Sequence, residues 1–301
     1  MIEIRPLSIH IGAEIHGVDL TRPLAPQTVQ EIRAALLQWR VVFFRDQHLN
    51  HEQQTGFARQ FGELTPGHVV FGNDADYPAI YSVAKHRMAN RHQRQGVMKP
   101  WTGWHTDLTA AINPPAASIL RGEIVPPYGG DTQWTNLVVA YDSLSPALQG
   151  FIDGLRGVHR YAIPQAAHNT EEYDEVVSRR AMVSEHPLVR VHPETGERAL
   201  YCSPSFLKSI VGLTPRESEQ VLELLWEHAI RPEFTVRFRW EPGSLAFWDN
   251  RSTAHLAPRD IFASDFERQF YRITLMGDVP AGVDGKTSVS LEGDPIAPLP
   301  L

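Results

Sequence analysis

The chain has 301 residues, of which 42% are hydrophobic and 21% charged, and its formal net charge is −7. This composition is typical of a globular protein with a sizeable core, and the negative charge argues against general affinity for nucleic acid. With one cysteine, Cys202, no disulfide can form within the chain, which favours a reducing compartment. The first residues lack the apolar run of a signal peptide, and no stretch approaches the roughly 18 apolar residues of a membrane span. We therefore expect a cytoplasmic protein that does not bind nucleic acid or membranes.

The first third of the chain predicts short strands and helices in alternation. Loosely alternating residues over 7–20 indicate an opening hairpin, helical spacing of apolar residues predicts a helix over 27–38, and an apolar run predicts a strand at 41–44. A second helix is expected near 52–61. The irregular segment 66–104 predicts a long loop with one strand near 79–83, and we expect residues 69–103 to act as a lid.

The rest of the chain is dominated by short β-like runs separated by turn signals. Strands are expected at 117–120, 132–134, 188–192, 199–202, 235–240, 244–248 and 270–276, with one helix at 215–228. No internal repeat, low-complexity tract or long linker is visible, so a single domain over 1–301 is expected. Many short strands with flanking helices predict a mostly β protein of the α+β type, built as a sandwich or jelly roll.

Three polar residues offer ligands for a metal ion. His105 and Asp107 lie two residues apart, so in an extended segment both side chains point to the same side. His255 follows the predicted strand 244–248 and supplies a second imidazole. Two histidines and one carboxylate form a facial triad with open positions, which suits Fe(II). An isolated His-x-Asp is weak support by itself, because histidines are more often packing or surface residues.

Two arginines add a second signal. Arg268 and Arg272 lie four residues apart in a strand-like segment, so both side chains share one face. Buried guanidinium groups are costly unless anions pair with them, and the planar fork of arginine suits carboxylates and sulfonates. From these residues alone, two solvent-facing arginines on an edge strand remain an alternative.

The chain resembles the taurine/2,4-D dioxygenase family of Fe(II)/2-oxoglutarate-dependent enzymes in a series of ordered blocks. The blocks are residues 12–20, 42–47, 57–64, 129–132 and a closing block from 248 to 278. The resemblance implies a double-stranded β-helix (a cupin-like jelly roll) and a dioxygenase that uses Fe(II), 2-oxoglutarate and O₂. It implies that His105, Asp107 and His255 bind iron, and that Thr132 and Arg268 bind 2-oxoglutarate.

The resemblance also implies where the substrate binds. Arg272 matches the position that pairs with the substrate anion in sulfonate-using members, while His68 and Phe206 match residues around the substrate. Phe71 and Trp101 stand where the taurine enzymes have a tyrosine and an asparagine. The loss of these two hydrogen-bonding groups should favour a bulkier or more apolar substrate, so taurine itself is not expected.

We therefore expect hydroxylation of a small anionic substrate, with release of succinate and CO₂. A sulfonate or sulfate ester is favoured, and the alternative within the same chemistry is a carboxylate such as an aryloxyacetate or a biosynthetic intermediate. A zinc hydrolase would leave Arg268 and Thr132 without a role. A non-catalytic metal-binding or sensor protein on the same fold would have no reason to keep the whole triad. Since the family tends toward dimers and tetramers, a homo-oligomer is expected.

Overall fold

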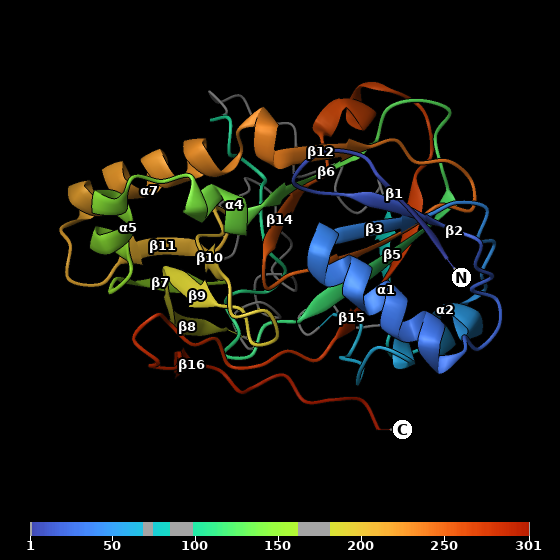
Figure 1. The fold of residues 1–301 in the computed structure, drawn as a ribbon, viewed down its shortest axis with the longest axis horizontal. Helices are drawn as coiled ribbons and strands as arrows, with labels where there is room; N and C mark the ends of the chain where they lie inside the picture. The colour runs from blue at the N-terminus through green and yellow to red at the C-terminus, as the bar shows by residue number, and fades with distance from the viewer. Residues whose placement is uncertain (1, 69–74, 85–98, 162–180, 301) are drawn as a thin grey trace, which may run out of the picture.

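The computed structural model describes residues 2–68, 75–84, 99–161 and 181–300. Its largest element is a seven-stranded sheet with the order β1-β2-β3-β13-β5-β15-β4 (Figure 1). Its strands are β1 (Glu3–Pro6), β2 (Ala13–His16), β3 (Val41–Phe44), β4 (Tyr81–Ala84), β5 (Ala117–Ile124), β13 (Leu245–Asp249) and β15 (Gln269–Leu275). The β2–β3 pair is parallel, and the other neighbours are antiparallel.

A second sheet, with the order β12-β6-β14, packs against the first. Its strands are β6 (Thr132–Asn136), β12 (Thr235–Phe238) and β14 (Thr253–Leu256). Aromatic rings fill the space between the two sheets: Phe43 stacks on Phe238 with ring centroids 4.0 Å apart, and Trp134 meets Trp248 edge-on at 5.5 Å. Two facing, mostly antiparallel layers around an aromatic core confirm the expected mostly β jelly roll.

Helices α1 (Pro26–Trp39) and α2 (His51–Arg59) cover the outer face of the seven-stranded sheet (Figure 1). All four residues of β3 are buried, because Val42 and Phe44 pack with these helices while Val41 and Phe43 face the second sheet. A capping box at Asn50 starts α2. Burial on both faces explains why β3 is a continuous apolar run.

The other end of the molecule carries two smaller sheets and the remaining helices (Figure 1). A four-stranded sheet, with the order β11-β7-β8-β16, contains β7 (Arg156–Arg160), β8 (Val183–Pro187), β11 (Leu207–Ile210) and β16 (Val289–Glu292). Strands β9 (Val189–Val191) and β10 (Arg198–Leu200) form a separate pair. Helices α4 (Leu137–Asp142), α5 (Pro146–Ile152) and α7 (Pro215–Ala229) bury apolar residues against these strands. Two 3₁₀ helices, η1 (Pro232–Phe234) and η2 (Arg259–Ala263), precede β12 and β15.

The strands and helices predicted from the sequence are confirmed, with boundaries moved by a few residues. The opening hairpin is β1 paired with β2, but β1 lies before residue 7, so the expected boundary is wrong. The sequence does not reveal α4, α5, β7, β8, β11, β14 or β16. In β8 the buried positions include Ser184 and His186. The ring nitrogens of His186 contact the hydroxyl of Ser288 and the carbonyl of Thr109. Because these distant partners satisfy its polar side chains, β8 can be buried without an apolar pattern in its sequence.

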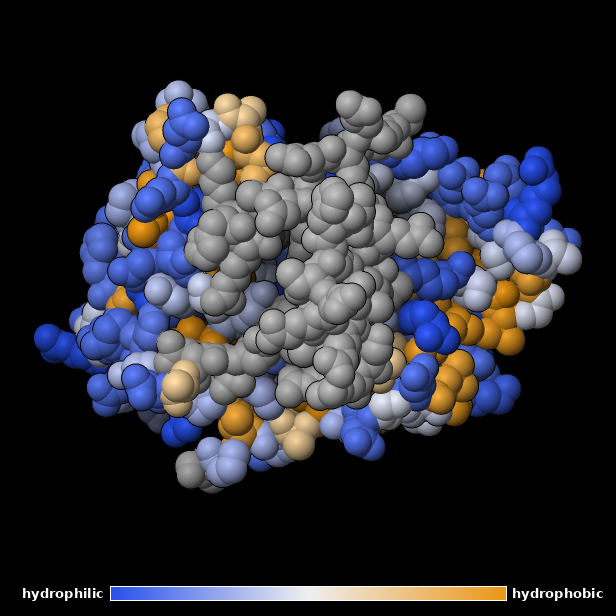
Figure 2. Space-filling view, turned by 180° about the vertical axis from the view of Figure 1, so that it is seen from behind, coloured by the Kyte–Doolittle hydropathy of each residue, from blue (hydrophilic) through white to orange (hydrophobic). Residues whose placement is uncertain are grey.

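The expected lid at 69–103 falls largely on residues 69–74 and 85–98, which lie outside the described residues. Within the ranges described, no helix is both long and apolar enough to cross a membrane. Among the coloured residues of Figure 2, most of the reverse face is hydrophilic, and apolar residues gather toward the end that carries α5 and α7. Exposed apolar side chains at that end include Phe151 and Leu224.

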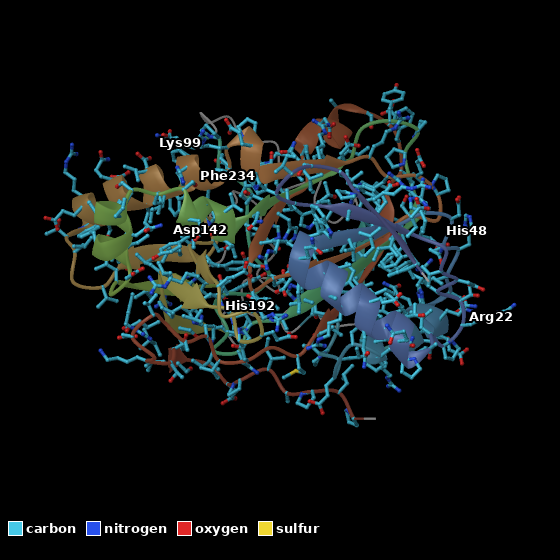
Figure 3. All side chains as sticks on the ribbon, viewed as in Figure 1. Arg22, His48, Lys99, Asp142, His192 and Phe234 are labelled. Carbon is cyan, nitrogen blue, oxygen red and sulfur yellow. The ribbon has the colours of Figure 1, made fainter. Side chains whose placement is uncertain are left out.

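A buried charged cluster joins the end of β13 to the smaller sheets. The carboxylate of Asp249 accepts bonds from Nε and Nη2 of Arg251 (2.9 and 2.6 Å) and from Nε2 of His192 (3.0 Å). Nδ1 of His192 accepts two backbone N–H bonds, so its proton is on Nε2. Figure 3 shows His192 in the interior. Burial by itself raises the pKa of Asp249, but Arg251 and His192 outweigh burial and hold the pKa well below its usual value.

We expect Asp249→Asn to destabilise the fold in a pH-dependent way. Because the pKa is lower in the folded chain, the carboxylate contributes stability above the unfolded pKa of about 3.9, and this contribution is lost as the pH falls below that value. Breaking a buried pair of this kind costs about 3–5 kcal/mol at pH 7. Denaturant titrations should show this loss in the free energy of unfolding at pH 7 and a smaller loss in acid.

Asp142→Asn is the matched control. Partial burial and the nearby Glu197 raise the pKa of Asp142, so removing its charge should not weaken the fold at pH 7. An equal loss of stability in both variants, or a loss at Asp249 that does not vary with pH, would contradict this account.

Close backbone packing at Gly277 gives a second prediction. A Cβ at this position would overlap the carbonyl oxygen of Pro114, which as part of the backbone cannot swing aside. We expect Gly277→Ala to cost about 2–3 kcal/mol of unfolding free energy. Gly150→Ala in α5 meets nothing within 4 Å and should gain about 0.5–1 kcal/mol. Thermal unfolding compares the two variants, and equal stability would show that the chain around Gly277 relaxes without cost.

Candidate active site

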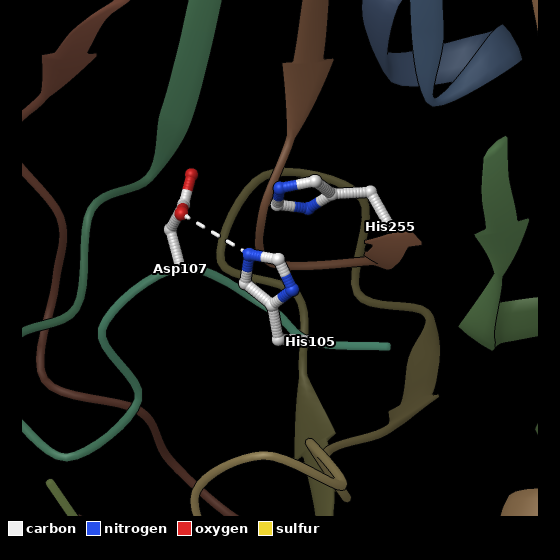
Figure 4. Close-up of side chains that lie close together, drawn as sticks. All are labelled: His105, Asp107 and His255. Carbon is white, nitrogen blue, oxygen red and sulfur yellow. Dashed lines mark ion pairs between the residues drawn. The ribbon is translucent and has the colours of Figure 1, made fainter. Parts of the chain in front are cut away.

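A backbone bridge brings two histidines from distant parts of the sequence together. The amide of His105 donates to the carbonyl of His255 (2.9 Å), and the reverse bond is 2.7 Å. The two rings lie 4.1 Å apart, and Oδ1 of Asp107 lies 3.9 Å from Nε2 of His105 (Figure 4). One ligand-type atom from each of the three side chains lies within 4.8 Å of the other two. The structure therefore assembles the triad that was expected from the sequence.

Both imidazoles have a nitrogen lone pair available. Nδ1 of His105 lies 2.9 Å from the carbonyl oxygen of Gly103, so Nδ1 carries the proton and Nε2 keeps its lone pair on the side of Asp107. Burial, reinforced by His105, lowers the pKa of His255 to about 3, so this ring is neutral at physiological pH. Nδ1 of His255 is buried without a hydrogen-bond partner among the described residues. A neutral imidazole that offers a nitrogen within 4.8 Å of the Asp107 carboxylate fits a metal ligand.

Two strands of the seven-stranded sheet orient Asp107. Ser118 on β5 donates to Oδ2 at 2.6 Å, and Nη1 of Arg272 on β15 donates to Oδ1 at 2.6 Å. Ser118 accepts a bond from the side-chain amide of Asn250 (2.8 Å), which accepts in turn from the indole of Trp248 (2.9 Å). Burial raises the pKa of Asp107, but the guanidinium of Arg272 and the Ser118 bond hold it well below its usual value. The carboxylate is therefore ionised and fixed in direction.

The triad lines a cavity of about 250 Å³. Five residues predicted to bind 2-oxoglutarate or the substrate also line it: His68, Thr132, Phe206, Arg268 and Arg272. The other lining residues were not predicted from the sequence; they are Tyr81, Ser82, Val83, Ala84, Leu108, Leu120, Tyr161, Trp248 and Ala257. β4 enters the wall because its Tyr81 pairs with Arg272 of β15, and that register leaves no mark in the sequence.

Two residues predicted to contact the substrate are not found in the described wall of the cavity. Phe71 lies outside the described residues. Trp101 is buried, but its ring packs against Trp226 of α7 with centroids 5.9 Å apart, and it is not among the residues lining the cavity. The structure therefore gives Trp101 a packing contact with α7.

Arg268 presents a buried cation to the cavity. Arg268 is only 5% exposed. Its Nε donates to the carbonyl of Gly130 (3.1 Å), and its guanidinium carbon lies 3.9 Å from the centroid of the Phe270 ring. The two aspartates that act on the charge of Arg268, Asp131 and Asp260, form ion pairs with Arg237. Burial lowers the pKa of Arg268 to about 10, so the group remains charged at neutral pH. A buried arginine of this kind fits an anionic ligand.

Thr132 also lines the cavity. Its hydroxyl oxygen accepts a bond from the indole N–H of Trp240 at 3.0 Å. The hydroxyl proton can then point toward an acceptor in the cavity. Together, the cation of Arg268 and this hydroxyl can hold a carboxylate by charge-assisted bonding.

Comparisons with known proteins agree with this geometry. The family model described as "Taurine catabolism dioxygenase TauD, TfdA family" matches residues 3–274. An alpha-ketoglutarate-dependent sulfate ester dioxygenase of Pseudomonas putida is 38% identical over 95% of this chain and 93% of its own length. An alkylsulfatase of Acinetobacter baylyi is 38% identical over 94% of this chain and 88% of its own length.

The likeness extends to a solved structure. The crystal structure of a taurine dioxygenase from Burkholderia xenovorans is 64% identical to this chain, with a TM-score of 0.87, and the match covers 98% of this chain and 96% of that one. These matches span both sheets and the strands that carry the cavity. The chain belongs to the TauD/TfdA family of taurine catabolism dioxygenases.

Proposed function

We propose that the protein hydroxylates a small organosulfur anion, with a sulfate ester as the favoured substrate and a sulfonate as the next. The enzyme is an alpha-ketoglutarate (2-oxoglutarate)-dependent dioxygenase with Fe(II) as cofactor and O₂ as co-substrate. The observation that carries the proposal is a single cavity in which the triad, the buried Arg268, the partly buried Arg272 and apolar walls come together. The two relatives named for sulfate esters support the same substrate class.

We propose that His105, Asp107 and His255 hold the Fe(II). The neutral imidazole of His255 and Nε2 of His105 offer lone pairs, and the ionised carboxylate of Asp107 offers the negative charge that a divalent ion requires. When bound, iron and 2-oxoglutarate supply the oxidising chemistry, in which O₂ and 2-oxoglutarate are converted to succinate and CO₂ while a substrate C–H is hydroxylated. We further propose that Arg268 and Thr132 hold the 2-oxoglutarate carboxylate that is remote from the metal.

Arg272 is the proposed anchor for the sulfur-bearing group. One of its nitrogens bonds Asp107, and its Nε is buried without a partner among the described residues, so donors remain for a second anion. We propose that His68 and Phe206, with the unforeseen Tyr81 and Tyr161, enclose the organic part of the substrate. These walls exclude water and hold one carbon next to the reacting site.

Taurine fits this cavity poorly. Asp107 is the sole carboxylate among the described lining residues, and Ser118 and Arg272 already bond it. The ammonium group of taurine would therefore find no unengaged anion, whereas an alkyl tail would meet apolar and aromatic side chains. This supports a sulfate ester or sulfonate with an apolar tail.

Hydroxylation would also cleave a sulfate ester at its C–O bond. Hydroxylation of the carbon attached to the ester oxygen gives a hemiacetal sulfate. This product eliminates sulfate and leaves an aldehyde, so the C–O bond breaks without direct hydrolysis. In this step Arg272 stabilises the departing anion by charge-assisted bonding.

The protein should release sulfate from alkyl sulfates in a reaction that requires 2-oxoglutarate. Anaerobically Fe(II)-loaded protein would be given O₂, 2-oxoglutarate and an alkyl sulfate, an alkylsulfonate, an aryloxyacetate or taurine. We expect stoichiometric succinate and sulfate with the alkyl sulfate and little product with taurine. His255→Ala should abolish turnover because the metal loses a ligand.

His48→Ala is the matched control, since His48 is an exposed histidine that does not line the cavity; Figure 3 labels it. It should retain full activity. Preferred turnover of the aryloxyacetate would assign the substrate to the carboxylates, and succinate formation unaffected by every organic anion would reject the proposed substrate class.

The bond from Ser118 to Asp107 gives a separate prediction for the metal site. Ser118→Ala removes the donor that fixes Oδ2, so the carboxylate can rotate and metal binding should weaken about 10-fold. Mn(II) affinity, measured by calorimetry without O₂, tests this independently of turnover. Ser143→Ala, at an exposed serine, should bind Mn(II) as the unmodified protein does. Equal affinity in all three proteins would remove Ser118 from the metal site.

We also propose that the enzyme works in the cytoplasm as a single-domain homo-oligomer, a dimer or a tetramer. The single cysteine and small anionic substrate support the location. Exposed apolar side chains such as Phe151 and Leu224 offer surface for self-association.

A further inference from the structure

The segment that follows β16 runs back across the molecule and docks at two places (Figure 1). The side-chain amide of Asn113 donates to the carbonyl of Ile296 (2.9 Å) and accepts from its N–H (2.8 Å). Farther on, the N–H of Leu299 donates to the carbonyl of Leu64 (2.8 Å), and Leu299 packs on the core under α1 and α2. The C-terminal segment is therefore anchored at two points, Ile296 and Leu299. Ile296 is bonded by Asn113, which lies in the loop after Asp107.

The loop that contains Asn113 forms part of the cavity wall through Leu108. Leu108, which follows Asp107 directly, lines the cavity and has φ +47°, in the left-handed region that non-glycine residues seldom adopt. Surrounding structure must hold a residue in such a conformation. Leu108 belongs to a buried apolar cluster with Ala110, Ala111, Met182 and Ile296. Ile296 thus packs in the apolar cluster to which the cavity residue Leu108 belongs.

The same cluster reaches other cavity residues. Tyr161 and Phe206, which both line the cavity, pack against the cluster that contains Ile296. From the other side, β8 supports the loop through Ser184, whose hydroxyl donates to the carbonyl of Ala110 (2.9 Å). β16 pairs with β8, so one continuous stretch of the C-terminal region backs the apolar side of the cavity.

We propose that Asn113 and Ile296 are positioning residues that fix the apolar wall, and that the C-terminal segment thereby sets the length of substrate tail that the enzyme accepts. This inference rests on the proposed function, because it concerns the organic tail of the anion. The side chain of Asp107 is bonded by Ser118 and Arg272, and that of Arg268 by the carbonyl of Gly130, and none of these contacts involves Asn113 or Ile296. Loosening the segment should therefore change tail selection without changing binding of the metal or of 2-oxoglutarate.

Ile296→Ala tests the inference with linear alkyl sulfates of increasing length. Truncation opens space behind Leu108, so the wall can retreat and longer tails can enter. We expect KM for the tail preferred by the unmodified enzyme to rise about 10-fold, the optimum to move to a longer tail, and kcat for the new optimum to stay within about 2-fold. Affinities for Mn(II) and 2-oxoglutarate should not change. Asn113→Ala should shift selection in the same direction.

Two further variants make the result interpretable. Ile296→Val removes a single methylene group, should fold normally, and should give a smaller shift in the same direction. Leu291→Ala removes an equally large apolar side chain from the 54% exposed Leu291 on β16 and should leave tail preference unchanged. An equal shift in Leu291→Ala would overturn the inference, as would loss of Mn(II) affinity in both Ile296 variants.

The outcomes also separate this inference from the function on which it rests. An unmodified enzyme that turns over alkyl sulfates, with a length preference that Ile296→Ala and Asn113→Ala leave in place, overturns the inference alone. An unmodified enzyme that turns over no sulfate ester or sulfonate overturns the proposed substrate class and the inference together.

Discussion

The burial of one carboxylate constrains the arrangement of both sheets. Asp107 is 3% exposed, and an ionised carboxylate at such a depth is very costly unless charged and hydrogen-bonding partners surround it. Its partners come from separate strands: Ser118 on β5 and Arg272 on β15 in the large sheet, and His255 on β14 in the small one. The two layers must therefore pack in one register for this charge to be tolerated. The same requirement directs the carboxylate toward the proposed iron site.

A second buried carboxylate, that of Asp249, is linked to Asp107 through neighbouring hydrogen bonds. Asp249 ends β13 and ties that strand to the smaller sheets through Arg251 and His192, whereas the next residue, Asn250, bonds Ser118 and so supports Asp107. One short turn between β13 and β14 thus serves the fold and the site. This explains why the closing block of the sequence is so dense in polar residues that are buried.

The cavity divides its tasks between parts of the chain that pack separately. Strand pairing holds Arg272 on β15 and His255 on β14 in place, and Arg268 directly precedes β15. The apolar wall around Leu108 and Phe206 instead depends on a loop backed by the C-terminal segment. Chemistry and tail selection therefore rest on different supports, and the second can change while the first remains intact.

The sequence by itself determined the helices α1, α2 and α7 and strands such as β3 and β13, because burial of one or both faces leaves a periodic or continuous apolar pattern. Its ordered blocks also indicated the triad, which the fold then brought together. Only the tertiary structure decided the rest. β8 buries serine and histidine with distant partners, Tyr81 reaches the cavity through the β4–β15 register, and Trp101 packs on α7 instead of lining the cavity. Each depends on contacts between residues far apart in the chain, which local composition and spacing do not encode.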